Sequence, residues 1–189
     1  MAEMARIRDA GKVRHFGTSN ESAWGMTTWN RLAAKTGGPR METVQNEYSL
    51  LCRMYDTDMA EMSHHEQVSL LAYSPLAAGL LTGKYAQGGS GRLTEDDRYA
   101  ARYGQDWMHE AAKGLCAMAD EVGVAPATLA VAWAARHPAN PMPILSARSS
   151  KQLAPSLAAL EFTMDDALYN RLTALTPTPP PATDRIEEA

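Results

Sequence analysis

The order of strand and helix patterns along the chain is the feature that most restricts its fold. Four short apolar segments with strand character lie at residues 12–20, 41–50, 68–76 and 142–147, and helical patterns separate them. Strands that alternate with helices pair in parallel, because each helix carries the chain back to the end where the next strand begins. We therefore expect an α/β fold with one parallel sheet covered by helices. Residues 86–106, rich in glycine and charge, are expected to form a long loop.

Every one of the four strand patterns runs into polar residues. These residues are Thr18-Ser19-Asn20, Gln45-Asn46-Glu47, Tyr73-Ser74 and Ser146-Ala147-Arg148. Since the carboxyl ends of parallel strands meet at one edge of a sheet, these side chains should lie close together. The sequence thus predicts the functional site at that edge.

The third strand pattern continues into an unusual stretch, VSLLAYSPLAAGLLTGKY, at residues 68–85. Its buried half ends on Tyr73 and Ser74, and Gly79, Gly83 and Lys84 follow. Packing explains an apolar strand, but it gives no reason for a phenol, a hydroxyl, several glycines and a lysine in this order. Taken alone, a buried tyrosine followed by an ordinary glycine-rich turn would also account for the stretch.

Four blocks together carry a family resemblance. GKVRHFGTSN, TVQNEYSLL, LLAYSPLAAGLLTGKY and ILSARSSKQL, in this order and spacing, resemble the C-terminal half of an aldo-keto reductase, with the nearest likeness to the bacterial Tas-like branch. The resemblance extends from Gly11 to about Leu175. It implies the last four βα units of a (β/α)8 TIM barrel. Residues 1–176 would form this partial barrel, and residues 177–189 a disordered, proline-rich tail.

The resemblance implies NADP(H) as the cofactor and assigns its nicotinamide end first. Tyr73 would stack its ring on the nicotinamide, because a flat aromatic face fixes that ring and shields it from water. Ser19, Asn20 and Gln45 would hydrogen-bond the carboxamide, which needs a donor and an acceptor. Singly, a cap and loop role for Ser19 and Asn20, or a core amide role for Gln45, is equally reasonable.

The phosphates and the adenosine would lie along the turn after the third strand and the helix after the fourth. Small side chains and main-chain N–H groups would line the pyrophosphate, from Ser74, Pro75, Leu76, Ala77, Gly79 and Leu81. Lys84 would supply a point charge to a phosphate. Arg148, preceded by Ser146 and Ala147, would receive the 2′-phosphate, since a guanidinium fork suits a dianion. Gln152 and Ser156, four residues apart on one helical face, would meet the adenine.

This chain departs from the family pattern at three of these positions. Ser146 stands where glycine is frequent, Ser156 where asparagine is frequent, and Pro155 where an acidic residue is usual. These departures imply weakened contacts to the adenine.

The residues that perform catalysis in this family have no counterpart in this chain. Family members use a tyrosine as general acid, helped by a lysine, an aspartate and a histidine, all in the N-terminal half. None of the matching motifs occurs here, so we assign no catalytic residue. The resemblance also implies that Met1 falls partway through the barrel, through a truncated gene, a misassigned start or a deliberate fragment.

Three functions therefore remain open at this stage. The chain, or the full-length protein that it represents, would reduce a small aldehyde or ketone with NADPH once completed by an N-terminal half. It would alternatively be a non-catalytic nucleotide-binding module, similar to the potassium-channel β subunits, or a fragment without function. The sequence upstream of Met1 would separate these alternatives most directly.

Charge and cysteine content restrict the partners. A net charge of −4 argues against nucleic acid and anionic membranes, since both require a basic surface. We find no apolar run of about 20 residues and no signal peptide. Cys52 and Cys116 share no metal-binding spacing, so we predict no metal site and expect free thiols in a reducing cytoplasm.

An open sheet of four strands also predicts self-association. Apolar side chains on the strands would be exposed where a closed barrel buries them, namely Val13, Phe16, Val44, Leu70, Ala72 and Ile144. We therefore expect a dimer or larger assembly through the open barrel face, or a poorly soluble chain.

Overall fold

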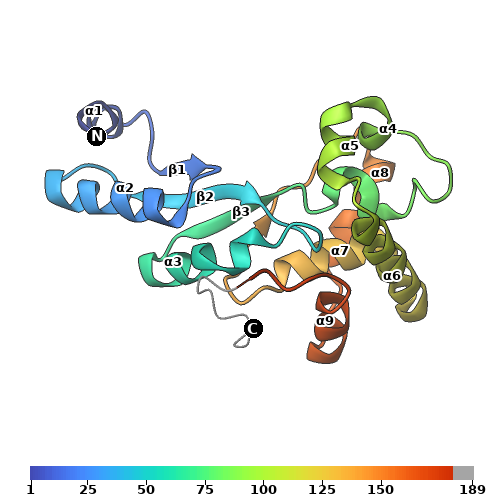
Figure 1. Cartoon of the computed structure of the whole chain (residues 1–189). Helices are drawn as coiled ribbons and strands as arrows, with labels where there is room; N and C mark the ends of the chain where they lie inside the picture. Colours follow the sequence, from blue (N-terminus) through green and yellow to red (C-terminus); the bar gives the residue numbers. More distant parts are fainter. Residues whose placement is uncertain (181–189) are drawn as a thin grey trace.

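The computed structural model describes residues 1–180, and it contains one sheet of four parallel strands (Figure 1). The strands are β1 (Phe16–Ser19), β2 (Met41–Glu47), β3 (Ser69–Tyr73) and β4 (Met142–Pro143), in the order β1-β2-β3-β4. This arrangement confirms the α/β prediction and is consistent with part of a (β/α)8 barrel. The predicted tail lies mostly outside the described residues.

Helices connect and flank the strands. The longer ones are α1 (Ala2–Asp9), α2 (Ala23–Thr36), α3 (Asp58–Glu66), α5 (Asp97–Tyr103), α6 (Asp106–Val122), α7 (Pro126–Ala135), α8 (Ser150–Leu157) and α9 (Asp166–Thr173). Shorter turns are η1 (Met54–Asp56), η2 (Ala77–Thr82), α4 (Arg92–Glu95) and η3 (Ala158–Leu160). In Figure 1 the strands point toward the end of the molecule that carries α4, α5 and α8, whereas α1 lies at the opposite end.

Local sequence signals explain where several helices begin and end. The Ser22 hydroxyl accepts a hydrogen bond of 3.1 Å from the Gly25 N–H and so caps the start of α2. Gly37 ends that helix in the left-handed region, with φ of 68°. Pro126 occupies the first turn of α7, where its missing N–H costs nothing.

Two predicted elements differ in the structure. Residues 86–106 are not one long loop but hold α4 and α5, because the Asp96 carboxylate accepts from the Arg98 N–H (3.0 Å) and caps α5. The fourth strand is limited to β4, although Ile144 N–H still donates to Ala72 C=O at 2.8 Å. Residues 146–148 therefore follow β4 in an irregular segment instead of ending a strand.

The two faces of the sheet differ in composition and burial. On one face, Val44 lies between Thr18 and Leu70, and Val44, Leu70 and Ala72 are fully buried. The prediction that these three side chains would be exposed is wrong, because strand alternation turns them toward the helices. The opposite, open face carries the row Ser19, Gln45, Leu71 and Met142, of which Met142 is 49% exposed. The open face is thus mixed in character and not a continuous apolar patch.

Helix α7 forms the centre of the core beside the sheet. All residues from Ala127 to Ala134 are buried, and Trp133 stacks between Tyr48 and Tyr169 with centroids 5.5 and 5.9 Å away. Among residues 1–180, no single helix is long and apolar enough to cross a membrane, and α6 with α7 reach that threshold only as a pair bent by 101°.

Candidate functional site

The ends of β1, β2 and β3 bring four of the predicted site residues together. The Tyr73 hydroxyl donates to Asn20 Oδ1 at 2.8 Å, and Asn20 Nδ2 donates to Ser19 Oγ at 3.3 Å. Ser19 Oγ donates in turn to the main-chain oxygen of Gln45 at 3.3 Å, and that oxygen also accepts from Asn20 N–H at 3.0 Å. The Gln45 side chain lies beside Ser19 in the strand register.

Asn20 adopts a backbone conformation that few residues tolerate. Its φ is 54°, in the left-handed region where asparagine is enriched. This conformation turns the chain away from β1 and lets the amide meet the phenol of Tyr73. Burial, followed by the nearby Glu47 carboxylate, raises the pKa of Tyr73, so the phenol stays protonated at neutral pH.

The turn after β3 is held in an uncommon backbone conformation. Ser74, Ala77, Ala78 and Gly79 all have positive φ, between 46° and 92°. Successive left-handed residues produce concave backbone that can direct N–H groups toward an anion. In this turn, however, the Ala77 N–H donates to Ser74 C=O, and the Gly79 and Leu81 N–H groups donate to Leu76 C=O, while Pro75 has no N–H. Pro75, Ala77 and Leu81 are buried, whereas Ser74, Leu76 and Gly79 are partly exposed.

Lys84 lies against the same turn. Its Nζ donates to Ser90 C=O at 3.0 Å and sits 4.7 Å from the centroid of the Tyr85 ring. A Cβ at Gly79 would come within 3.0 Å of Lys84 Cε, and one at Gly91 within 2.3 Å of Nζ. Glycine at both positions therefore leaves room for the lysine.

The segment after β4 places Arg148 at the start of α8. Its side chain is 85% exposed, and its main-chain N–H donates to Gln152 Oε1 at 2.9 Å. Ser149 caps α8 by accepting from Gln152 N–H at 3.2 Å. Ser146 and Gln152 are exposed, and Ala147 is partly exposed.

Ser156 does not share the exposed face of Gln152. Only 4% of Ser156 is accessible, although the two residues lie four apart on α8. We therefore leave Ser156 out of the candidate site.

Glu47, one of the polar residues predicted at the strand ends, has a role that the sequence analysis did not assign. Glu47, at the end of β2 and beside Tyr73 in the register, accepts a hydrogen bond from the Tyr103 hydroxyl. Arg102 NH1 lies 3.4 Å from Glu47 Oε2, and the Glu47 side chain is only 13% exposed. These two contacts hold α5 against the end of β2.

A helix-start signal in the sequence could have revealed part of this contact. Asp96 in RLTEDDRYAARY is a suitable cap for a short helix, and such a helix brings Arg102 and Tyr103 to its last turn. The partner Glu47 lies 56 positions away from Tyr103, and no local pattern indicates such a pairing.

The other phenols near the strand ends are poor proton donors. Tyr48 is fully buried, and burial raises its pKa strongly. Burial, and next the hydrogen bond to Glu47, also raises the pKa of Tyr103. A general acid works best with a pKa near the working pH, and these environments move the phenols away from it.

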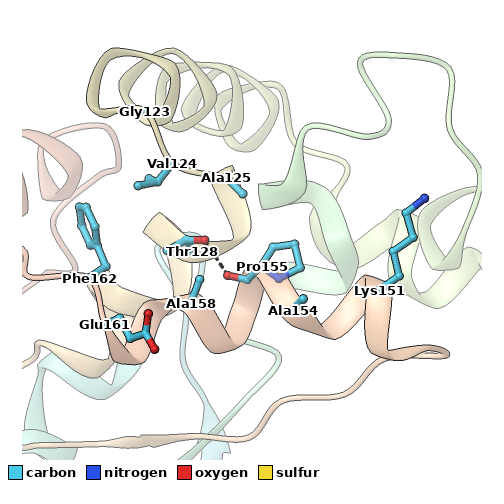
Figure 2. Close-up of a pocket in the computed structure, with 10 residues that line it drawn as sticks. All are labelled: Gly123, Val124, Ala125, Thr128, Lys151, Ala154, Pro155, Ala158, Glu161 and Phe162. Carbon is cyan, nitrogen blue, oxygen red and sulfur yellow. Dashed lines mark hydrogen bonds between the residues drawn. The ribbon is translucent and has the colours of Figure 1, made fainter.

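An open groove of about 570 Å³ lies elsewhere, between the α6–α7 connection and α8 (Figure 2). Small and apolar side chains line most of it, and Thr128 Oγ1 donates to Pro155 C=O at 2.6 Å across its floor. Lys151 and Glu161 are its charged lining residues. Its lining includes none of the residues predicted to bind a cofactor. Within residues 1–180 we also find no group of three metal-ligating side chains.

Comparisons with known proteins agree with one family. A sequence model of the Aldo/keto reductase family matches residues 1–177. The chain is 35% identical over 175 residues to Protein tas of Escherichia coli K12, covering 91% of this chain and 50% of that protein. It is 30% identical over 174 residues to the uncharacterized oxidoreductase YrpG of Bacillus subtilis, covering 90% and 51%.

This chain is also similar to a plant protein that is described as a channel subunit and not as an oxidoreductase. A probable voltage-gated potassium channel subunit beta of Oryza sativa is 32% identical over 168 residues, which cover 82% of this chain and 49% of the subunit. This chain spans about half the length of these three curated relatives.

Proposed function

This chain belongs to the aldo/keto reductase family, and we propose that it provides the nucleotide-binding side of an NADP(H)-dependent carbonyl reductase. A bound NADPH supplies a hydride to an aldehyde or ketone. The residues of this chain bind the cofactor and orient its nicotinamide and phosphates. A small carbonyl compound is the proposed substrate when an N-terminal half completes the barrel.

The convergence of Ser19, Asn20, Gln45 and Tyr73 at three strand ends carries this proposal. An amide pair and a hydroxyl offer the donors and acceptors that a carboxamide requires. Tyr73 offers a flat ring whose hydroxyl is already held by Asn20, which fixes its orientation. This donor set fits a nicotinamide.

The phosphate side of the proposed site is supported by backbone conformation and charge. The tight left-handed turn after β3, with Ser74 and Gly79 partly exposed, would let the pyrophosphate approach the backbone closely, and Lys84 would neutralise a phosphate. Arg148 would bind the 2′-phosphate with its planar fork, beside the N-terminus of α8. These groups fit a dinucleotide that carries an additional phosphate.

We propose that the chain alone does not turn over carbonyl substrates. Hydride transfer creates an alkoxide that must gain a proton, and general acid catalysis contributes about 10²–10⁴-fold. Tyr48, Tyr73 and Tyr103 all have raised pKa values. The same observation favours a second candidate, a nucleotide-binding module without catalytic activity, and a probable voltage-gated potassium channel subunit beta is among the proteins similar to this chain. Because both cysteines are free thiols, we propose a cytoplasmic location for either role.

Titration with NADPH and NADH, followed by quenching of protein fluorescence, tests the cofactor assignment. Arg148→Ala should weaken NADPH binding by about 10- to 150-fold, the equivalent of about 1.5–3 kcal/mol for a hydrogen bond to a charged group. NADH binding should change little. Arg6→Ala on α1, at the opposite end of the molecule, is the matched control. Equal affinity of the unmutated chain for both nucleotides would exclude this role of Arg148.

Turnover separates the reductase from the binding module. The purified chain should oxidise NADPH with a nitrobenzaldehyde no faster than the background rate. Addition of the N-terminal half of a close relative as a separate polypeptide should restore some turnover, because it returns the acid and closes the barrel. Restoration favours the reductase, and bound nucleotide without restoration favours the module. Rapid turnover by the chain alone would show that an acid within it was missed.

A further inference from the structure

Arg148 has an acidic neighbour from a distant part of the chain. Its NH2 lies 3.9 Å from Glu95 Oε2, at the end of α4. Both side chains face solvent, with 85% of Arg148 and 51% of Glu95 exposed. A ligand that approaches the guanidinium therefore also approaches this carboxylate.

The position of α4 is fixed by contacts on both sides. The Tyr85 hydroxyl donates to Ala78 C=O at 3.0 Å and accepts from Leu93 N–H at 3.2 Å, which ties α4 to the turn after β3. The following helix, α5, is held to the end of β2 by Glu47. Glu95 thus belongs to a segment that is anchored to two strand ends.

We propose that Glu95 is a specificity-determining residue that lowers the preference of the site for nucleotides with a 2′-phosphate. This inference rests on the proposed function, in which Arg148 binds that phosphate. The guanidinium pairs either with Glu95 or with the phosphate, and the carboxylate repels the incoming dianion. A nucleotide with a 2′-hydroxyl brings no charge to this position, so Glu95 does not repel it, and removal of the carboxylate should not strengthen its binding.

Removal of the carboxylate should therefore strengthen NADPH binding selectively. Exposed ion pairs are weak, so Glu95→Gln is expected to tighten NADPH binding by about 1.5- to 5-fold. Glu95→Lys, which reverses the charge, should have a larger effect in the same direction. Both gains should shrink in 1 M salt, where the screening length falls to about 3 Å.

Dissociation constants for NADPH and NADH, measured at about 0.05 M and 1 M salt, test this proposal. Glu110→Gln on α6 removes the same charge from an exposed carboxylate that pairs with Lys113, and it should change neither constant. Unchanged or weaker NADPH binding in both Glu95 variants, with wild-type binding intact, would overturn this inference alone. Weaker binding would show that Glu95 orients Arg148 for the ligand. Absence of NADPH binding by the wild-type chain would overturn the proposed function as well.

Discussion

Replacement of Tyr103 by phenylalanine tests whether the contact with Glu47 holds α5 at the strand ends. Tyr103 is 1% exposed, and its hydroxyl donates to a carboxylate of which 13% is exposed. Phenylalanine keeps the buried ring and removes only the donor. A hydrogen bond to a charged group contributes about 1.5–3 kcal/mol, so we expect the free energy of unfolding to fall by that amount.

Thermal unfolding and hydrogen exchange measure the two consequences. For a chain of this size, about 1 kcal/mol corresponds to about 2–4 °C, so the midpoint should fall by about 3–12 °C. Amide exchange should accelerate mainly in residues 86–106, because α5 loses its attachment while the sheet keeps its own hydrogen bonds. Glu47→Gln should have a smaller effect, since its amide oxygen still accepts from Tyr103.

Tyr99→Phe is the matched control on the same helix. Its ring lies 5.6 Å from the Arg92 guanidinium, and phenylalanine retains an aromatic face for that contact. We expect little change in the unfolding midpoint. Equal midpoints for Tyr103→Phe and Tyr99→Phe, or faster exchange spread evenly over the chain, would refute the assignment of Glu47 as the anchor of α5.

Three further predictions follow from the same structure. The free energy of unfolding should fall as pH rises above about 10, because burial keeps Tyr48 and Tyr103 protonated in the folded chain while the unfolded chain releases those protons; urea unfolding at several pH values checks this, and constant stability would contradict it. Gly83→Ala should cost about 1–3 kcal/mol, since φ is +75° and a Cβ would lie 2.7 Å from Cys116 Sγ; Gly37→Ala, with φ of +68° and open space, should cost less, and equal losses would rule out the sulfur contact. Sedimentation should show a dimer or larger, because β1 and β4 leave open sheet edges within residues 1–180; a compact monomer that binds no hydrophobic dye would contradict this.

Much of the fold could be predicted because its signals are local. The cap at Ser22, the glycines after helices and the apolar strand segments depend on neighbours within a few residues. The parallel direction of pairing also follows, since alternating helices return the chain to the same end of each strand. The extent of β4 could not be predicted, because a short apolar segment does not specify how many of its residues pair.

Some features of the candidate site could also be predicted from the sequence, and others could not. The strand-end positions of Asn20 and Tyr73 were visible as polar residues after apolar ones, whereas Arg148 lies in an irregular segment beyond β4. The burial of Ser156 could not be predicted from the sequence, because helical spacing shows which residues share a face but not which face the rest of the protein covers. The assignment of Val44 to the open face failed for the same reason.

The type of fold, the family and the edge of the sheet at which polar groups gather could all be predicted from the order of residues alone. These features depend on the order of residues and on periodicities of two and 3.6, which the chain carries locally. The side of the sheet that the helices cover, and the contacts of Glu47 and Glu95 with residues of distant segments, depend on how the whole chain packs. Such contacts form because packing brings together side chains whose separation in sequence, 56 positions for Glu47 and Tyr103, contains no information about their distance in space.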